Sequence, residues 1–372
     1  MARCYKSKAM RLTDEVLRDI WNNCYPRNCR LPSEETLAVR YNCSRMTMRK
    51  ILTSLISDGI LIKIPGSGTK LHPQLDLPAP PCADNSCCKK IAAVMAAFPD
   101  ILTIEVNRGI HDYAMQNGIS FTLLQNTEGP TLLAQNLKQL DTAVFSGVIG
   151  FGTDAACNDQ LRMLSEKGFP VVCVDNPVDG SAIPYIGVDN FGGMYSAAAH
   201  LLTRSENALY YIGHRMERHS QQERYRGYCA AMTAYGMDEL IPACSITIPV
   251  SQTSGKYLDT DQERLLTEAA EKLLANPRPF GVVAECDYIA RSILKTAEKM
   301  HLAPGKDFFI IGFDDLPQAE KMDLSSVHQP RYELGFEAAR LLNQIINGHP
   351  VPGESRLLPV TLKLRGSSGR DQ

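Results

Sequence analysis

Two arginines and a lysine, Arg45, Arg49 and Lys50, fall within the first two turns of a predicted helix over residues 44–57. The dipole of a helix disfavours cations near its N-terminus, so the helix itself gives no reason for this placement. A DNA duplex does, because its major groove admits one helix and an arginine can pair with a guanine edge through two hydrogen bonds. We therefore expect a DNA contact here, with an ordinary amphipathic core helix as the alternative. The residues expected to face DNA from this helix are Ser44, Arg45, Thr47, Arg49 and Lys50.

The elements that must position these cations can be predicted from their surroundings. Ser44 is a good N-cap, and one apolar face is predicted by the helical spacing of Met48, Ile51, Leu52, Leu55 and Ile56. A second helix is predicted from residue 33 to about 40, and two short helices joined by a tight turn form a helix-turn-helix. Gly59 is expected to end the helix, and the runs 60–64 and 69–71 predict a hairpin. A further amphipathic helix over 12–25, with Trp21 as a core anchor, is expected to pack behind.

Charge is distributed unevenly along the 372 residues. Residues 1–75 hold 13 Lys and Arg against 6 Asp and Glu, whereas residues 76–372 hold 26 against 35. A basic head on an acidic body suits a module that binds a polyanion, joined to a body that does not share that partner. Four prolines between residues 72 and 88 predict an extended linker. The expected domains are therefore 1–71, a linker over 72–88, and 89–372.

Several classes of protein are disfavoured by composition. No apolar run approaches the ~18 residues of a membrane span, and the N-terminus lacks the apolar core of a signal peptide. We expect a cytoplasmic protein without a membrane partner. The 12 cysteines are scattered without paired C-x2-C spacing, so free thiols are favoured over a zinc site, and no cofactor is expected.

From Lys89 onward, short apolar runs alternate with helical patterns. This alternation predicts an α/β fold with parallel sheets and crossover helices. Two such series, over 89–175 and 208–313, predict two lobes with a cleft between them. Open α/β sheets bind ligands beyond the carboxyl ends of their strands. The residues near such ends that are expected to line the cleft are Phe98, Asp100, Phe151 and Asp175.

Several short motifs follow one another in a specific order along the head. LPSE, an S-R-x-T-x-R core, a DG helix end and GSGT follow one another over residues 31–71. This block resembles the winged helix-turn-helix of the GntR family of transcription regulators. The resemblance implies a wing that touches the DNA backbone or minor groove through Gly66, Ser67, Gly68 and Thr69. The family usually has arginine after the PSE triplet; this chain has Glu35, which is therefore not expected to hold DNA.

The body resembles the effector-binding domain of the LacI/GalR family, whose fold is related to the periplasmic sugar-binding proteins. The segments that carry this resemblance are VDNFGGMYSAAAHLL, ALYYIGH, RYRGYCAAM, FGVVAECDYIA, FFIIGFDDLPQA and SSVHQPRYELGFEAARLL, within residues 89–366. A GntR-type head on such a body resembles the arabinose-responsive repressors. The resemblance implies a two-lobed, periplasmic-binding-protein-like domain with a small-molecule site between its lobes.

Individual site residues follow from the same resemblance. Arg224 matches a family residue that bonds ligand hydroxyls or carboxylates, and Asp314 matches a carboxylate that accepts from ligand donors; together they suit a sugar. From local sequence alone, Arg224 could instead form a surface ion pair and Asp314 could cap a helix. Cys286 stands where the family often has asparagine, and a thiol donates and accepts poorly. The effector is therefore expected to differ from common family sugars, or other residues take over. Asp287 is expected to cap the next helix.

We expect a ligand-responsive transcriptional repressor rather than an enzyme. The sequence carries no G-x-S-x-G, H-E-x-x-H or phosphate-binding loop, and His214 and His219 fit a loop tip better than a metal site. A homodimer would present two heads to a near-palindromic DNA operator. A nucleotide-dependent α/β enzyme and a regulator controlled by a protein partner remain the alternatives. Induction is favoured by family analogy, with corepression left open.

Overall fold

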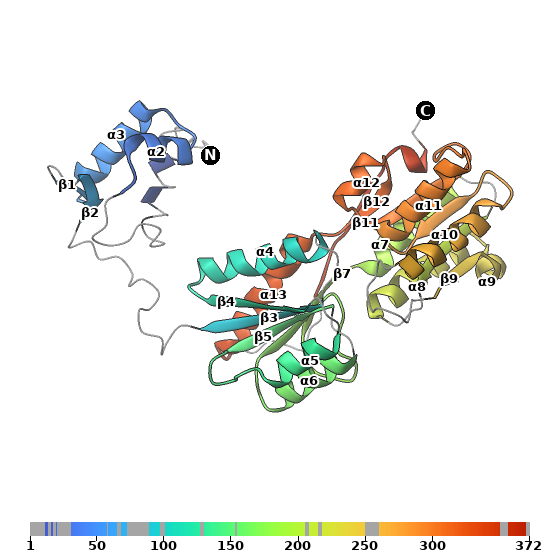
Figure 1. The fold of residues 1–372 in the computed structure, drawn as a ribbon, viewed down its shortest axis with the longest axis horizontal. Coiled ribbons are helices and arrows are strands. Elements are labelled where there is room, and N and C mark those ends of the chain that lie inside the picture. Colours follow the sequence, from blue (N-terminus) through green and yellow to red (C-terminus); the bar gives the residue numbers. More distant parts are fainter. Residues whose placement is uncertain are drawn as a thin grey trace, which may run out of the picture. The chain divides into compact units, whose positions relative to one another are not determined.

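The computed structural model describes residues 12–13, 16–17, 20, 31–57, 59–64, 68–72, 89–96, 101–126, 130–152, 155–204, 208–214, 218–249, 260–349 and 356–369. The contacts divide the chain into two compact units, Met1–Cys88 and Lys89–Gln372, called the head and the body below. Both are drawn in Figure 1, and each is described by itself.

The head is built on two helices joined by a tight turn. They are α2 (Glu34–Arg40) and α3 (Arg45–Ser57). The hydroxyl of Ser33 accepts the backbone N–H of Thr36 at 3.1 Å, and the hydroxyl of Ser44 accepts that of Thr47 at the same distance. Each cap satisfies an N–H that has no partner within the helix. The predicted starts of both helices are thus confirmed.

One face of α3 is buried, as its apolar spacing predicts. Met48, Ile51, Leu52 and Leu55 are buried, and Ile56 packs partly against them. They meet Leu12, Val16 and Ile20, which are helical in the structure and belong to the same core. Trp21 and the rest of the predicted first helix lie outside the described residues.

A short hairpin follows α3. Gly59, with φ at +72°, ends the helix as predicted, and β1 (Leu61–Ile64) pairs antiparallel with β2 (Gly68–Leu71). The backbone N–H of Leu31 donates to the carbonyl of Thr69 at 2.8 Å, which ties the hairpin to the start of the helix-turn-helix. The head therefore has the winged form that its motifs imply. Gly66 and Ser67, at the expected tip, lie outside the described residues.

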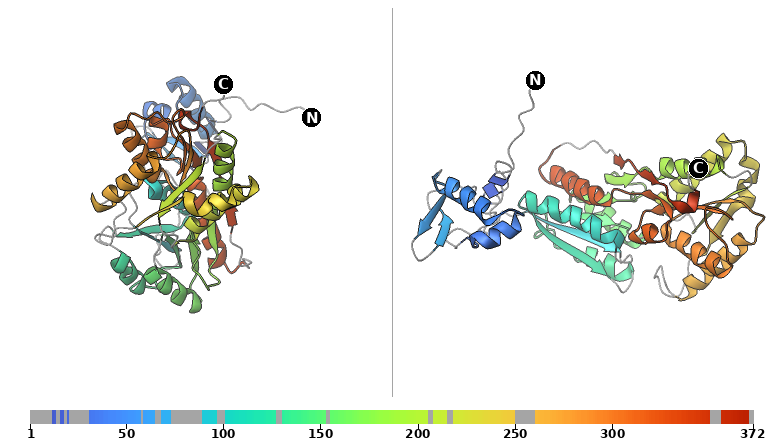
Figure 2. Two further views of the ribbon diagram at one scale, coloured as in Figure 1. Left: turned by 90° about the vertical axis from the view of Figure 1, so that its right-hand side faces the viewer. Right: turned by 90° about the horizontal axis from the view of Figure 1, so that it is seen from above.

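Lobe I of the body holds a six-stranded parallel sheet in the order β13-β7-β6-β5-β3-β4. Its strands are β3 (Lys90–Ala96), β4 (Ser120–Asn126), β5 (Gly147–Phe151), β6 (Val171–Val174), β7 (Tyr185–Val188) and β13 (Arg356–Leu358). Helices α4 (Ile101–Gln116) and α13 (Arg331–Ile346) cover one face, and α5 (Pro130–Lys138) and α6 (Ala155–Glu166) cover the other (Figures 1 and 2). Because both faces are covered, the strands are apolar on both sides.

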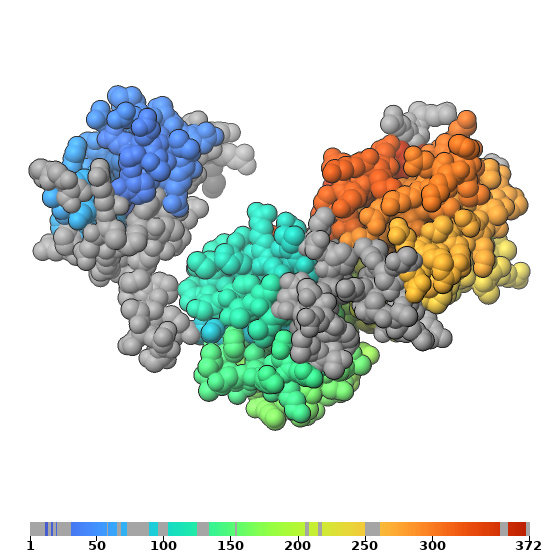
Figure 3. All heavy atoms as spheres, in the orientation of Figure 1, coloured from blue at the N-terminus to red at the C-terminus, as the bar shows by residue number. Residues whose placement is uncertain are grey.

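Lobe II holds a second six-stranded sheet in the order β14-β12-β11-β10-β8-β9, parallel except for the last strand along the chain. Its strands are β8 (Leu209–His214), β9 (Ser245–Ile248), β10 (Gly281–Ala284), β11 (Phe309–Asp314), β12 (Ser325–His328) and β14 (Thr361–Lys363). One face packs on α7 (Asn190–Leu202) and α8 (His219–Ala234), and the other packs on α10 (Thr260–Leu274), α11 (Asp287–Lys299) and α12 (Pro317–Lys321). The short helix α9 (Ile241–Cys244) precedes β9. In the space-filling view of Figure 3, orange residues cover much of lobe II, and cyan to green residues cover lobe I.

Within the described residues, the chain passes between the lobes at three places. It leaves lobe I from β7 into α7, returns from β12 into α13, and leaves again from β13 into β14. The two-lobed α/β architecture is the one predicted, but these crossings were not predicted. They matter for the site because Gln329 comes from the segment between β12 and α13, and Arg331 from the first turn of α13.

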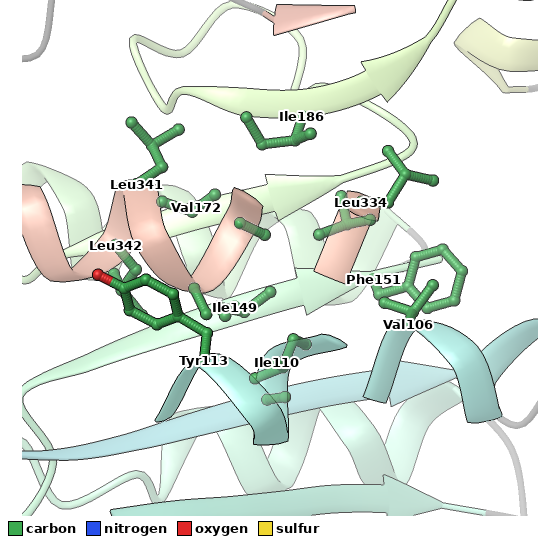
Figure 4. Packing of buried hydrophobic residues seen from close by; sticks show 14 of the residues in the cluster. Val106, Ile110, Tyr113, Ile149, Phe151, Val172, Ile186, Leu334, Leu341 and Leu342 are labelled. Carbon is green, nitrogen blue, oxygen red and sulfur yellow. The ribbon is translucent and has the colours of Figure 1, made fainter. Parts of the chain in front are cut away.

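Helices α4 and α13 touch without a side chain between them at Gly335 and also at Gly109, where an added Cβ atom would lie 2.0 Å from the carbonyl oxygen of Tyr332. A Cβ atom added to Gly335 would lie 1.9 Å from the carbonyl oxygen of Val106, so only glycine allows this approach. Figure 4 shows Val106 and Leu334 grouped with Phe151 at one end of the lobe I core. Val106 and Leu334 thus lie on the two helices that approach closely, and together with Phe151 they line the cavity described below.

No helix among the described residues combines the length and apolar character that crossing a bilayer requires.

Candidate functional site

The exposed face of α3 presents two arginines that share one carboxylate. The side chains of Arg45 and Arg49 are 63% and 58% exposed. Glu34, at the start of α2, lies 3.3 Å from Nε of Arg49 through Oε1 and 3.7 Å from Nε of Arg45 through Oε2. Both contacts use Nε, so the terminal nitrogens can still form the pair of hydrogen bonds that a guanine edge accepts.

The other described residues expected to contact DNA lie at the start of α3, on α3 itself and in β2. Lys50 is exposed on α3, and the hydroxyls of Ser44 and Thr47 lie 2.8 Å apart at its start. Gly68 and Thr69 are half-buried in β2. Glu34 is not among the residues predicted from the sequence, because a contact between α2 and α3 over 15 positions leaves no local pattern.

A cavity of about 810 Å³, open mouth included, lies between the two lobes of the body. Its wall contains five of the predicted effector-binding residues: Phe151, Asp175, Arg224, Cys286 and Asp314. The others along it are Val106, Arg218, Ser220, Gln221, Glu285, Tyr288, Gln329, Arg331 and Leu334. Phe98 and Asp100 lie outside the described residues. Seven segments distant in sequence thus converge on one concave space with polar and apolar walls, which is typical of a small-molecule site.

Arg224, on α8, is held rigidly in the floor of the cavity. It is 7% exposed, so the alternative of a surface ion pair is wrong. Its Nε donates to Oδ1 of Asn190 at 2.8 Å, and one Nη donates to the carbonyl of Glu285 at 2.7 Å. Burial disfavours the charge, but Asp314, Asp175 and Glu285 outweigh that effect and raise the pKa of Arg224 above its ordinary value.

Asp314 ends β11 beside that guanidinium. Its Oδ1 accepts from Nε2 of Gln329 at 2.5 Å and lies 3.7 Å from the other Nη of Arg224. Burial raises the pKa of Asp314, while Arg224 and Arg331 oppose the shift. Asp314 caps no helix, because α12 begins only at Pro317, after Leu316. The alternative role as a cap is therefore wrong, and the carboxylate stays within the wall of the cavity.

Glu285, which the sequence analysis did not single out, follows β10 and is 4% exposed. Its Oε2 accepts the backbone N–H of His214 at 2.7 Å, and Oε1 accepts from Nε2 of Gln221 at 3.0 Å. Burial works against its charge, but His214 and Arg224 outweigh it and lower the pKa of Glu285. His214 is buried at the end of β8, so its placement at a loop tip is wrong.

Asp287 does not cap α11, contrary to expectation. Its Oδ2 accepts the backbone N–H of Leu316 at 2.8 Å, and its Oδ1 accepts from the hydroxyl of Ser326 at 2.6 Å. Burial and the nearby Asp314 raise the pKa of Asp287 to about 8. The carboxyl therefore ties α11 to the strands behind the cavity. Burial also raises the pKa of the Cys286 thiol well above its usual value, so this residue lines the cavity as a neutral group.

A backbone donor of lobe II bonds to a side chain of lobe I at the cavity. The backbone N–H of Ser220, in the first turn of α8, donates to Oδ1 of Asn176 from lobe I at 2.9 Å. Asn176 follows Asp175, which has φ at +72° and accepts from the Asn176 amide at 2.7 Å. A change in the separation of the lobes would alter this contact. The cavity is thus placed where a bound molecule can contact both lobes at once.

The cavity combines donors, acceptors and apolar walls, which suits a small polar molecule with several hydroxyls. The described residues contain no group of three or more His, Cys, Asp and Glu side chains arranged to hold a metal ion. A winged helix-turn-helix with exposed arginines, in one chain with a two-lobed body that has a cavity between its lobes, defines a DNA-binding regulator that responds to a small molecule.

Comparisons with known proteins agree with both parts. Residues 8–71 match the bacterial regulatory proteins of the gntR family, and residues 198–368 match the periplasmic binding protein-like domain. The chain therefore joins a gntR-family head to a periplasmic-binding-protein-like body.

The chain also has relatives in sequence and in structure. The chain is 24% identical over 358 residues to the arabinose metabolism transcriptional repressor of Geobacillus stearothermophilus, covering 92% of each chain. It is 26% identical over 261 residues to the ribose operon repressor of Bacillus subtilis, covering 69% of this chain and 74% of the relative. A LacI family transcriptional regulator from Enterococcus faecium, solved with bound ribose, has a TM-score of 0.62 at 23% identity and covers 76% of this chain and 100% of its own.

Proposed function

We propose that this protein is a ligand-responsive transcriptional repressor that binds operator DNA through α3 and the wing, and binds a sugar-like metabolite between its lobes. One observation carries the proposal: a single chain presents exposed arginines on α3 of a winged head and, in its body, a polar cavity between two lobes. The role of the protein is then regulation in the cytoplasm, where DNA is accessible, and not catalysis.

The side chains around the cavity support a ligand with several hydroxyls. Arg224, Gln221 and Gln329 supply N–H donors, and Asp175, Asp314 and Glu285 supply acceptors. Val106, Phe151 and Leu334 form an apolar wall against which a ring face can pack. Relatives named for arabinose and ribose support the same class of ligand.

Two copies of the chain acting together would suit a near-palindromic operator, because the symmetry of a dimer is mirrored in its site. A surface of lobe I supports this association. Ile104 on α4 and Leu123 on β4 are exposed beside Phe121, around a shallow groove. The strand β4 also lies at an edge of its sheet. An exposed apolar patch next to a sheet edge is typical of an interface between subunits.

The ligand would act through the relative stability of two states of the body. It can shift the equilibrium only if it binds one arrangement of the lobes better than the other. Side chains from both lobes line the cavity, so a ligand that bridges them favours a closed arrangement. We expect the closed form to bind the operator less tightly, which makes the ligand an inducer. A ligand that instead tightened operator binding would be a corepressor, with the same site.

The test begins with DNA selection by the full chain from fragments of its own genome, at low ionic strength. We expect one or a few fragments with two-fold sequence symmetry to be retained. Arg45→Ala and Arg49→Ala should each lose ~1–3 kcal/mol of specific binding if the residue pairs with a base. Lys299→Ala, on α11 of the body, is a control that should leave the affinity unchanged.

Retention of no fragment above random DNA would contradict the proposal. So would unchanged operator affinity in both arginine variants, because the argument depends on those side chains. A nucleotide-dependent enzyme, the competing class, predicts instead a change in nicotinamide absorbance when the chain is mixed with the cofactor and candidate substrates.

A further inference from the structure

Arg331 is a buried cation that Asp314 and Asp287 attract electrostatically but that forms an ion pair with neither. It stands in the first turn of α13, where the chain crosses from lobe II to lobe I, and it lines the cavity. The residue is 8% exposed. One Nη donates to the backbone carbonyl of Asp314, but Nε is buried and has no hydrogen-bond partner among the described residues. No described carboxylate forms an ion pair with this guanidinium.

The acids nearest to the cavity are already engaged with other partners. Asp314 accepts from Gln329 and pairs with Arg224, Glu285 accepts from His214 and Gln221, Asp287 accepts from Ser326 and Leu316, and Asp175 accepts from Asn176. Each carboxylate thus has its own donors. None of these contacts involves Arg331, so Asp314 and Asp287 act on the guanidinium only through space, without a direct contact from a carboxylate oxygen.

A buried charge without a partner is costly, and proteins keep such groups where function needs them. Arg331 has both features of an anion-binding residue: a planar set of N–H donors, one of them buried without a partner, and a charge that no described carboxylate contacts. Its neighbours on the cavity wall, Val106 and Leu334, are apolar and give a bound anion little competition from water.

We propose that the effector carries an anionic group, a carboxylate or a phosphate, that pairs with Arg331. The hydroxyl-bearing part of the same molecule then contacts the polar groups around Arg224 and Asp314. This inference rests on the proposed function, because it names the chemical class of the ligand for that cavity. A sugar acid or a sugar phosphate has the required combination, whereas the parent neutral sugar lacks the group that Arg331 requires.

The experiment compares matched pairs of ligands on the full chain by calorimetry and thermal shift, at constant ionic strength. The neutral probes are glucose, galactose and ribose. Their acidic counterparts are glucuronate and glucose 6-phosphate, galacturonate, and ribose 5-phosphate. We expect at least one acidic member to bind at least tenfold more tightly than its neutral parent, because charge-assisted hydrogen bonds are about twice as strong as neutral ones. Whether the uronate or the phosphate binds identifies the anion.

Variants separate Arg331 from the rest of the site. Arg331→Met should lower the affinity for the acidic ligand about 10- to 100-fold and abolish its preference over the neutral parent. Arg331→Lys keeps the charge without the fork and should retain a weaker preference, which provides a test if the methionine variant does not fold. Arg340→Gln, on the same helix but paired with Glu337, is the matched control and should bind as the parent protein does.

Three results would overturn the inference: a neutral sugar that binds as tightly as its acidic counterpart, no binding of any acidic probe at 10 mM, or full affinity for the acidic ligand in Arg331→Met and Arg331→Lys. The same preparations are tested against the operator. If the chain binds its operator and a neutral sugar releases it, the proposed function stands, and only the inference of an anionic group on the effector is contradicted.

Discussion

Replacing Glu34 with glutamine should make the head less selective for its operator. Glu34 is the one described acid that contacts both Arg45 and Arg49, through its two carboxylate oxygens. The Glu34→Gln variant keeps the size of the side chain and the helix start, but removes the charge that fixes the two guanidinium groups. Arginines with more freedom lose more conformational entropy when they bind to bases.

The expected size follows from the geometry. Both contacts are partly exposed, with arginine side chains 63% and 58% accessible, and exposed ion pairs contribute ~0.2–1 kcal/mol each. If the orientation provided by both contacts is lost, the ratio of specific to non-specific affinity should fall by ~0.4–2 kcal/mol, or about 2- to 30-fold. Non-specific affinity should stay level or rise, because a negative charge near the phosphates is removed.

Fluorescence anisotropy with the operator and with a scrambled duplex, at two salt concentrations, measures this ratio. Glu35→Gln is the matched control, since Glu35 itself has no such contact with the two arginines, and this variant should keep the parent ratio. An unchanged ratio in Glu34→Gln, or an equal fall in both variants, would refute the idea that Glu34 orients the arginines. A circular dichroism spectrum of each variant, compared with that of the parent protein, tests whether the head remains folded.

Three further predictions concern the body. Asp314→Asn, which suits the positive φ of this position (+117°), should abolish the response of DNA binding to effector while operator affinity stays unchanged; a normal response in anisotropy would contradict the assigned role. Gly335→Ala forces a Cβ atom against the Val106 carbonyl at 1.9 Å, so calorimetry should show the body destabilised by ~1–3 kcal/mol, and an unaltered melting temperature would show that the helices separate freely. Asp287 has a native pKa raised to about 8 by burial and by Asp314, whereas an unfolded aspartate titrates near 4. The neutral Asp287 carboxyl therefore contributes fully to the free energy of unfolding below about pH 4, and this contribution is lost as the pH rises through about 8. As the pH rises over this range, the melting temperature of Asp287→Asn should fall less than that of the parent protein. An equal fall in both proteins would contradict the raised pKa of Asp287.

Much of the head could be predicted from sequence because its signals are local. Ser33 and Ser44 cap helices within three residues of themselves, and the buried face of α3 repeats at helical spacing. The hairpin follows from a glycine-containing turn between two short apolar runs. Glu34 was missed for the opposite reason: its contact with Arg49 joins two helices, and no spacing within one helix reveals it.

In the cavity, too, the residues with local sequence signals could be predicted. Phe151 and Asp175 follow strand ends, a local signal, and Arg224 and Asp314 were found through family motifs. Gln221 lies one helical turn before Arg224, so its presence on the same face could have been inferred.

Arg331 and the partners of Asp287 could not have been found in this way. Arg331 enters the site because the chain crosses between the lobes after β12, which has only four residues and gives little periodicity. The expectation that Asp287 caps its own helix was wrong because its carboxylate instead accepts an N–H 29 positions away. Such contacts depend on the packing of whole elements and not on neighbouring residues.

The most direct test of the account measures operator affinity of the full chain as a function of ligand concentration. We predict that a ligand which saturably raises the melting temperature of the body also shifts operator affinity, by about 5- to 150-fold, as is typical of coupled sites. By reciprocity, operator DNA must change the affinity for the ligand by the same factor. The account is contradicted if the chain prefers no double-stranded fragment of its genome, with or without the ligand, or if a ligand saturates the cavity and operator affinity does not change.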